Sequence, residues 1–551
     1  MALSLKDHRI LVVDDFREMR ITLRSMLESM QARELVEARS GEEALDALAK
    51  SRFDLVLCDY NLGPGRDGQH LLEEARHRGV LRPDAVWIMI TAENTMDMVM
   101  AVVEYAPDSY LVKPINKAVL QLRLERIFKR KAVLGAIESL LAKRDYDGAV
   151  TRADERLAAH PEFRLDVLKL KADALLARGD ADAAAEICAG LLADRDVPWA
   201  LLALGRARHL QGDMREALAR FSQAIAQNET HMAAYDWKAR VERELGDAEA
   251  AQRTLAQAAS LSPKVIRRHQ ALADLARANG DHATAEHAYR KALALGQKSC
   301  FARPEDAVGL VDVVAAARGP EAALRIANEL SGQATNRPAR PPRTPAPVSW
   351  RLTLVRAKLL LAKDDPTAAA SVKTALQGYQ REPEGTPVAV SIDLARACFQ
   401  CRMIDDAHAI MDRLVREHHD RADVIDAAHA LFAELDMTEH GAALIAGAQK
   451  AVVDINNEGV RLARAGNLAA AVTLLTRAAD ELPSNMTIAL NVSHVLLLRL
   501  RAEAWSNQTA YALANHLARA ARLDAQDPKL LRLQREYAEL ARAAGPQAVN
   551  S

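Results

Sequence analysis

Short apolar stretches that alternate with amphipathic segments most restrict how residues 9–130 can fold. Continuous apolar stretches of this length are typical of strands covered on both faces, as in a parallel sheet between helices. We therefore predict an α/β domain here. Its predicted strands are RILVVDD (9–15), RELVEAR (33–39), DLVLCD (54–59), AVWIMIT (85–91) and SYLVKP (109–114), and helices are predicted at 16–30, 41–51, 69–78, 96–106 and from 116 onward.

Polar side chains stand at the ends of four of these strands. Asp14 and Asp15 end the first strand, Asp59 the third and Thr91 the fourth, and Lys113 lies in the fifth. Ligands of open parallel sheets bind beyond the carboxyl ends of the strands, so these side chains should meet. Mg²⁺ prefers oxygen ligands and would relieve the repulsion between three carboxylates. A carboxylate beside Mg²⁺ can accept a phosphoryl group, whose oxygens an ammonium and a hydroxyl would hold.

Four motifs in this order resemble the receiver domain of two-component response regulators. They are VVDD (12–15), LVLCDYNL (55–62), MITAEN (89–94) and YLVKP (110–114). The resemblance covers residues 7 to about 128. It implies a flavodoxin-like (CheY-like) fold with strand order 2-1-3-4-5, a histidine kinase as partner, and a cis peptide bond between Lys113 and Pro114.

The resemblance also implies the roles of individual residues. These are Asp59 as phosphoacceptor, Thr91 and Lys113 as its catalytic partners, Thr91 and Tyr110 as the switch pair, and Asp14, Asp15, Asp59 and the backbone carbonyl of Asn61 as ligands of Mg²⁺. The loop NLGPGRDG (61–68) departs from the Met-Pro and Met-Asp-Gly pattern of many receivers. Asn61 and Glu93 occupy positions that tune dephosphorylation in the family. A receiver used only as a docking scaffold, and a Tyr110 that serves only in packing, are the alternatives.

A Gly-Asp pair recurs at a spacing of 33 or 34 residues after the α/β region. The four copies are Gly179-Asp180, Gly212-Asp213, Gly246-Asp247 and Gly280-Asp281. An alanine follows five residues after each glycine, and a larger residue four positions later: Ala184 and Cys188, Ala217 and Phe221, Ala251 and Leu255, Ala285 and Tyr289. This pattern predicts helix–turn–helix units in which small residues allow close packing. Such units bury their apolar faces only by stacking.

These units resemble the tetratricopeptide repeat (TPR). The clearest copy is 198–229, a later one is 453–485, and weaker ones are 388–421 and 130–163. We expect about nine to eleven helical pairs in total. A generic α-solenoid is the alternative. The resemblance implies an output through binding of a protein or peptide in the groove.

Composition shifts divide the chain into four parts. We predict a receiver at 1–128, a first TPR-like block at 129–330, a Pro/Arg-rich linker at 331–349 and a second TPR-like block at 350–545. The linker is basic through its arginines, so a docking segment is the alternative reading of it. The last receiver helix lacks a breaker over 116–145 apart from Gly135, and we expect it to continue as the first repeat helix.

Several other classes are disfavoured. The net charge is −1, which argues against binding to nucleic acid. No stretch is apolar enough to span a membrane, and the five cysteines suit a reducing cytoplasm, so we expect a bacterial cytoplasmic protein with no membrane span. Cys398 and Cys401 form a CxxC without a second ligand pair, which favours packing over zinc or redox chemistry. His418-His419 likewise favours an exposed helix over a metal site.

The sequence therefore predicts a response regulator phosphorylated on Asp59 by a histidine kinase, with protein binding as its output. The alternative is an adaptor or phosphate sink that sequesters or localises another signalling protein. The part after residue 130 has no P-loop, HExxH or GxSxG motif. We expect no enzymatic activity beyond the receiver's own phosphotransfer and dephosphorylation.

Overall fold

The structure is a computed structural model of the 551-residue chain. It describes residues 4–63, 65–92, 104, 107–335, 349–381, 386–503, 505–524 and 527–543. The chain folds as two compact units, the first ending at Ala322 and the second beginning at Ala323. Each unit is described separately.

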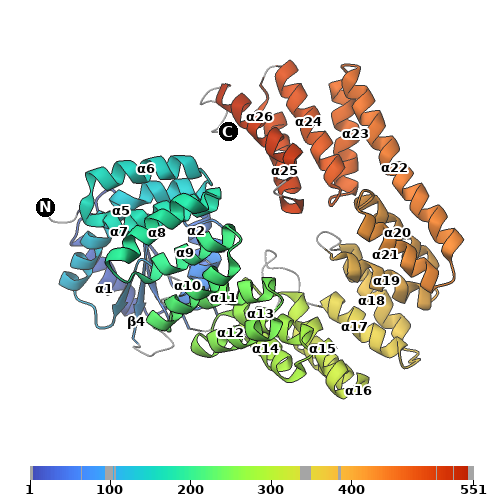
Figure 1. The fold of residues 1–551 in the computed structure, drawn as a ribbon, viewed down its shortest axis with the longest axis horizontal. Coiled ribbons are helices and arrows are strands. Elements are labelled where there is room, and N and C mark those ends of the chain that lie inside the picture. The colour runs from blue at the N-terminus through green and yellow to red at the C-terminus, as the bar shows by residue number, and fades with distance from the viewer. Residues whose placement is uncertain are drawn as a thin grey trace. The chain divides into compact units, whose positions relative to one another are not determined.

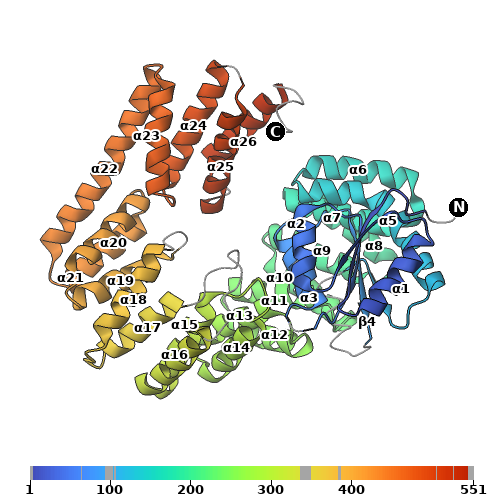
Figure 2. The same cartoon turned by 180° about the vertical axis from the view of Figure 1, so that it is seen from behind.

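The first unit begins with a five-stranded parallel sheet, as the sequence predicts (Figure 2). The strands run in the order β2-β1-β3-β4-β5, which confirms the predicted order. The strand ends differ from the predicted ones by a residue or two. The strands are β1 (Arg9–Val13), β2 (Glu34–Ala38), β3 (Leu55–Asp59), β4 (Val86–Thr91) and β5 (Ser109–Val112).

Helices cover both faces of this sheet, which explains why its central strands are apolar throughout. One core lies between the sheet and helices α1 and α5, and the other between the sheet and helices α2 and α3. The helix predicted at 96–106 lies outside the described residues, apart from Glu104. The described helices are α1 (Arg17–Glu28), α2 (Gly41–Lys50), α3 (Gly68–His77) and α5 (Lys117–Ala142).

Helix α5 continues without a break from the α/β domain into the helical region, as predicted. It has 26 residues, and the Asn116 side chain caps its start by accepting a hydrogen bond from the Val119 amide. Leu120 and Leu124 in its first half lie in the core beneath the sheet. Leu134 and Ile137 in its second half lie in the next core, with α6 and α7. One helix thus belongs to two hydrophobic cores.

The first helical block comprises the helices from α6 to α15, which pack in consecutive pairs (Figure 1). The first helices of successive pairs also contact one another, for example α7 with α9 and α9 with α11. The elements are α6 (Tyr146–Ala159), η1 (Pro161–Phe163), α7 (Arg164–Arg178), α8 (Ala181–Asp194), α9 (Pro198–Leu210), α10 (Met214–Gln227), α11 (Met232–Glu244), α12 (Ala248–Leu261), α13 (Ile266–Ala278), α14 (His282–Leu295) and α15 (Pro304–Arg318).

The repeated Gly-Asp pairs form the turns inside these helical pairs. Their glycines have φ of +89°, +82°, +83° and +76°, a region that favours glycine at the end of a helix. Each aspartate then caps the next helix, accepting a hydrogen bond from the amide three residues on at 3.2, 3.1, 2.9 and 3.1 Å. The alanines five residues after the glycines are fully buried. The periodic residues therefore set both the turn and the close packing.

Gly205 allows helix α9 to approach helix α10. A methyl group at Gly205 would lie 2.4 Å from the ring of Phe221, a side chain that is fully buried and cannot move away. We expect Gly205→Ala to destabilise this block by about 1–2 kcal/mol, because overpacking exceeds the gain in helix propensity. Hydrogen exchange of the α10 amides measures the effect. The control Gly190→Ala meets no atom within 4 Å and should slow exchange slightly or leave it unchanged.

The second unit is helical in all its described parts. Its long helix α22 spans 27 residues. It joins two segments that the repeat pattern assigns to separate repeats. The helices are α16 (Pro320–Thr335), α17 (Ser349–Leu361), α18 (Ala368–Arg381), α19 (Val388–Gln400), α20 (Ile404–Glu417), α21 (Ala422–Glu434), α22 (Thr438–Arg464), α23 (Leu468–Glu481), α24 (Met486–Ala502), α25 (Asn507–Leu523) and α26 (Pro528–Ala543).

The predicted linker 331–349 is shorter than expected at its beginning. Residues 331–335 continue helix α16, because a single glycine in SGQAT does not stop a helix and the first proline comes only at Pro338. Ser349 already belongs to α17. Residues 336–348, which carry its prolines and arginines, lie outside the described residues.

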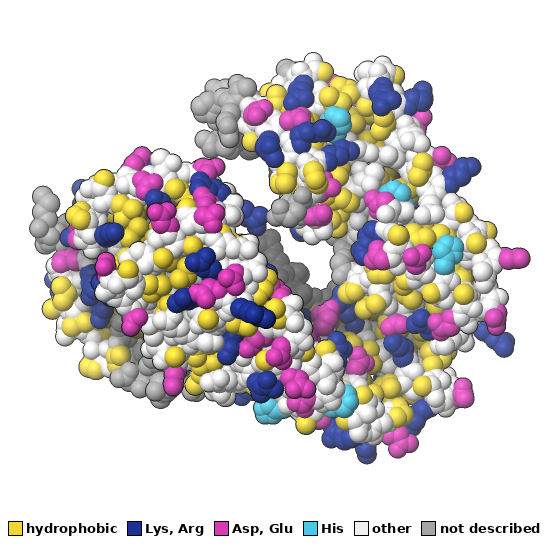
Figure 3. Space-filling view, viewed as in Figure 1, with side chains coloured by type: hydrophobic (Ala, Val, Ile, Leu, Met, Phe, Trp, Pro, Cys, Tyr) yellow, Lys and Arg dark blue, Asp and Glu magenta, His cyan; other side chains and the backbone are white. Residues whose placement is uncertain are grey.

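The surface charges and the state of the cysteines agree with what the sequence predicts. Basic and acidic side chains are interspersed over the visible faces (Figure 3). None of the helices in the described ranges has the length and apolar character needed to cross a membrane. All five cysteines are free thiols, and burial raises the pKa of Cys398 to about 12. Within the described residues, only one cluster of carboxylates, histidines or cysteines could hold a metal ion, and it contains neither Cys398 nor His418.

Candidate functional site

Three carboxylates meet at the carboxyl edge of the sheet. β1 and β3 are paired with Val13 opposite Cys58, so the next residues, Asp14 and Asp59, leave the sheet side by side. One oxygen from each of Asp14, Asp15 and Asp59 lies within 4.8 Å of the others. The structure therefore brings together the acidic residues that the sequence places at the strand ends.

Lys113 lies between two of these carboxylates. It follows β5, and its Nζ donates hydrogen bonds to Oδ2 of Asp14 at 3.1 Å and to Oδ2 of Asp59 at 2.9 Å. The peptide bond from Lys113 to Pro114 is cis, as expected. The only cation bonded to both carboxylates among the described residues thus comes from the strand on the far edge of the sheet.

Burial and neighbouring charges change the pKa values of Asp59 and Lys113. Asp14 and Asp59 are 0% and 4% exposed. Burial raises the pKa of Asp59 to about 6, with a further increase from the charge of Asp14 and an opposing effect of the hydrogen bond from Lys113. Burial by itself would lower the pKa of Lys113, but its bonds and charge interactions with Asp59 and Asp14 raise it above the ordinary value. The pocket therefore holds unneutralised negative charge.

The residues of this pocket fit a magnesium ion. All three clustered side chains offer carboxylate oxygens, the donors that Mg²⁺ prefers. Oδ1 of Asp15 is buried and has no hydrogen-bond partner within the described part of the chain. A buried carboxylate oxygen without a partner is unfavourable, so a cation or its water would satisfy it.

Thr91 and Tyr110 lie on one face of the sheet. β4 and β5 pair Met89 with Tyr110, and Thr91 follows Met89 by two residues, so all three side chains point to the same side. Thr91 is buried at the end of β4, and its carbonyl accepts a hydrogen bond from the Lys113 amide at 2.7 Å. Tyr110 is half-buried against the core under α2 and α3, and burial raises the pKa of its phenol. This placement is compatible with the predicted switch pair.

The loop after β3 contains the remaining predicted ligand. Asn61 lies two residues beyond Asp59 with an exposed side chain, so its role through the backbone carbonyl stays a prediction. Glu93 lies outside the described residues. Gly63 and Gly65 have φ of +71° and +125°, which favours glycine at both positions.

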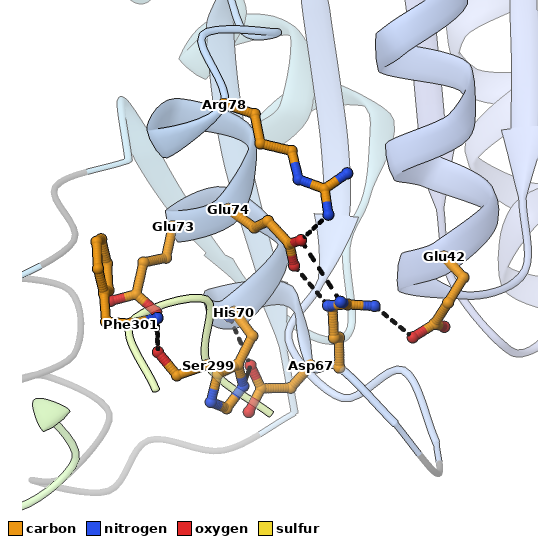
Figure 4. A network of polar contacts seen from close by, with 9 residues as sticks. Glu42, Asp67, His70, Glu73, Glu74, Arg78, Ser299 and Phe301 are labelled. Atoms are coloured by element: carbon orange, nitrogen blue, oxygen red, sulfur yellow. Dashed lines mark hydrogen bonds and ion pairs between the residues drawn. The ribbon is translucent and has the colours of Figure 1, made fainter. Parts of the chain in front are cut away.

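Arg66 is a site residue that the sequence reasoning missed. Its guanidinium pairs with Glu42 of α2 at 3.0 Å and with the buried Glu74 of α3 at 2.5 Å (Figure 4). Glu74 also pairs with Arg78. These ion pairs fix the loop to both neighbouring helices. The only local signal in the sequence was Glu74, a glutamate at a core-facing position of its helix. The spacing of the residues does not show that Arg66 is its partner.

Gly68 is a second residue whose structural role the sequence did not reveal. The sequence places it only in the loop motif after the third strand. Its amide donates a hydrogen bond to the Tyr60 carbonyl at 2.7 Å. A methyl group at this position would lie 2.3 Å from the carbonyl oxygen of Asp59, so only glycine lets α3 begin here. The first turn of α3 is thus held directly against the tip of β3.

Comparisons with known proteins agree with this geometry. Residues 10–125 match the family model of the response regulator receiver domain. Chemotaxis protein CheY-3 of Vibrio cholerae serotype O1 is 36% identical over 129 residues, which cover 23% of this chain and 98% of that protein. Chemotaxis protein CheY of Pseudomonas aeruginosa is 34% identical over 122 residues, covering 22% of this chain and 97% of that protein.

A solved structure of chemotaxis protein CheY4 of Vibrio cholerae is also similar. It is 26% identical, covers 23% of this chain and 99% of that chain, and has a TM-score of 0.21. The family match ends at residue 125, so the helical region lies beyond it. Because the relatives are covered almost completely by residues at the start of this chain, the chain belongs, through residues 10–125, to the response regulator receiver family.

Proposed function

We propose that the protein is a two-component response regulator that is phosphorylated on Asp59 by a histidine kinase and acts by binding another protein. One observation carries this proposal, which is the cluster of Asp14, Asp15 and Asp59, of which Asp14 and Asp59 are buried and bonded to Lys113. The membership in the receiver family supports it.

The proposed step is the transfer of a phosphoryl group from a phosphohistidine. A carboxylate oxygen of Asp59 attacks phosphorus, the phosphorus–nitrogen bond breaks, and the imidazole leaves with the electron pair and then takes up a proton. Mg²⁺ held by Asp14, Asp15, Asp59 and the carbonyl of Asn61 would neutralise the developing charge. The Lys113 ammonium, which already donates a hydrogen bond to Asp59, would bind the phosphoryl oxygens. The Thr91 hydroxyl would bind another of these oxygens and so bias the position of Tyr110.

The helical region is, on this proposal, a TPR-like module that binds a protein or peptide. The repeated left-handed glycine, capping aspartate and buried alanine support TPR geometry in the first block. Gly466, with φ of +80°, and the capping Asn467 repeat the turn in the second unit. Stacked units of this kind expose long faces suited to peptide recognition.

Phosphate incorporation from acetyl phosphate tests the proposed function. The intact mass of the full chain should increase by one phosphoryl group when Mg²⁺ is present and stay unchanged in EDTA. Peptide mapping should locate the group on Asp59. No incorporation with Mg²⁺, or incorporation elsewhere, would contradict the proposal.

Asp15→Asn tests the metal site separately. It removes the charge of a proposed ligand whose Oδ1 has no hydrogen-bond partner among the described residues, so we expect Mg²⁺ affinity to fall by at least about tenfold. Calorimetric titration with MgCl₂ measures this change. The control Asp46→Asn removes an exposed carboxylate from α2 and should leave the affinity unchanged. Equal affinities of the wild type and Asp15→Asn would exclude this carboxylate as a ligand.

A further inference from the structure

Helix α3 of the receiver lies against the first helical block. The Ser299 hydroxyl donates a hydrogen bond to Glu73 at 3.3 Å (Figure 4). The rings of His77 and Phe301 meet edge-on with their centroids 4.9 Å apart. Ser299 is buried, and it precedes α15 in the segment after α14. Side chains 226 residues apart in the sequence thus join the two parts of the first unit.

A second contact reaches the residue next to the phosphorylation site. Lys264, just before α13, donates a hydrogen bond from Nζ to the hydroxyl of Tyr60 at 3.3 Å. The same ammonium lies 5.7 Å from the centre of the Tyr60 ring, within the range of a cation–π interaction. Tyr60 directly follows Asp59 and is only 6% exposed. The helical block therefore touches the loop that leads out of the acidic pocket.

A third contact joins charges from both parts. Arg268 of α13 binds both oxygens of Asp236 of α11 at 3.0 and 2.9 Å and Glu104 of the receiver at 2.7 Å. Its side chain is 2% exposed, and a buried guanidinium requires such pairing. At this contact the helical block therefore supplies the cation, Arg268, and the receiver supplies the carboxylate, Glu104.

These contacts lie on the inner face of the first block. α11 and α13 are the first helices of their pairs and are joined by the ion pair of Asp236 with Arg268, and the first helices of such a stack lie on its concave side. A cavity of about 850 Å³ beside the contacts is lined by charged side chains of both signs, among them Arg76 of α3, Asp236 and Glu244 of α11 and Arg267 of α13. The receiver thus lies against the side of the block that carries α11 and α13.

The loop between Asp59 and α3 connects this interface with the phosphorylation site. The Tyr60 carbonyl binds the Gly68 amide, and Gly68 leaves no space above the Asp59 carbonyl. Asp67 caps the same helix by accepting a hydrogen bond from the His70 amide at 2.9 Å. A phosphoryl group on the nearly buried Asp59 needs room at the start of this loop. A displaced loop would move Tyr60 and the first turn of α3, which touch the helical block.

We infer that the receiver is an intramolecular ligand of the first helical block, and that phosphorylation of Asp59 weakens this docking and uncovers the inner face of α11 and α13. Several of the described contacts are single hydrogen bonds or ion pairs, so a shift of the loop that breaks them changes the populations of docked and released states. The docking stands on the contacts above, whereas its regulation rests on the proposed function.

Cys300 provides a reporter for the test. It lies in the interface between Ser299 and Phe301 and is partly buried. Burial, followed by the charges of Glu73 and Glu74, raises the pKa of its thiol to about 12, so alkylation should be slow while the receiver is docked. The experiment measures iodoacetamide labelling of Cys300 in the full chain by peptide mass spectrometry, with Cys401 of the second unit as internal reference.

Acetyl phosphate with Mg²⁺ should accelerate labelling of Cys300 by at least about fivefold and leave that of Cys401 unchanged, since losing one hydrogen bond has about this effect. Lys264→Ala should give a similar acceleration without phosphorylation. It alters an exposed side chain of a loop, so folding is not at risk. The control Lys291→Ala, an exposed lysine of α14, should label at the wild-type rate.

The outcomes separate the docking from the proposed function. Equal labelling of Lys264→Ala and wild type would overturn the docking, whether or not phosphate is incorporated. Incorporation on Asp59 with unchanged labelling would overturn the regulation and leave the proposed function intact. Absence of incorporation would contradict the proposed function and with it the regulation, while the Lys264→Ala comparison still decides the docking.

Discussion

Asp59→Asn is expected to abolish phosphate incorporation from acetyl phosphate, because an amide cannot form the acyl phosphate that a carboxylate oxygen forms. The substitution preserves the shape of the side chain, and Asp59 lies at a strand end already fixed by backbone pairing with β4. The fold should therefore persist. Intact-mass analysis after incubation with Mg²⁺ and acetyl phosphate measures the loss. Retained incorporation would mean that another residue accepts the phosphoryl group.

The same variant should be more stable than the wild type in EDTA at neutral pH. Asp59 has a folded-state pKa of about 6, above its value of 3.8 in the unfolded chain, so its ionisation opposes folding. The stability difference should be absent below about pH 4, grow as pH rises, and reach about 3 kcal/mol above about pH 6. Urea denaturation of the receiver at several pH values measures it. A variant less stable than the wild type at pH 7 would contradict this view of the pocket.

Gly68→Ala is expected to destabilise the receiver by about 3 kcal/mol. The added methyl group would lie 2.3 Å from the Asp59 carbonyl, 2.8 Å from the Met89 sulfur and 3.0 Å from that of Cys58. The nearest atom belongs to the backbone of a buried strand, so no side-chain rotation relieves the contact. Exchange of the slowest β3 and β4 amides should accelerate about a hundredfold.

A helical glycine in open space provides the matched control for this variant. Gly447 of α22 meets no atom within 4 Å when a methyl group is added. Gly447→Ala should therefore leave exchange in β3 and β4 unchanged and slow it slightly in its own helix. If Gly68→Ala exchanged like the wild type, α3 would have to begin elsewhere than against Asp59.

The sheet and its acidic pocket could be predicted because their signals are local. A buried parallel strand is a short apolar run, and the polar residue that ends it is next to it in the sequence. Strand order then determines which ends meet, so Asp14, Asp59 and Lys113 were expected together, and the structure brings them together. The turn formed by Gly179 and Asp180 could likewise be predicted, because the turn residue and the capping residue are adjacent in the sequence.

Contacts between distant segments could not be predicted in this way. Arg66 pairs with Glu42 across two elements, and Lys264 binds Tyr60 across 204 residues, with no periodic pattern to connect them. The predicted helix ends were wrong where residues that stop helices are sparse. α22 runs through the expected start of a repeat at residue 453, because AQKAVVDIN contains neither proline nor glycine. α16 extends past residue 330 although SGQAT contains one glycine, since a single glycine does not stop a helix.

The shared helix α5 has a practical consequence for protein engineering. A receiver fragment that stops at residue 128, just beyond the family match, would cut this helix in the middle. The remaining repeat fragment would then begin inside α5 and present Leu134 and Ile137 without the N-terminal cap at Asn116. Exchanging the sensor module with that of another regulator would have to preserve the helical phase through Ala142, because an insertion of one residue turns everything downstream by about 100°.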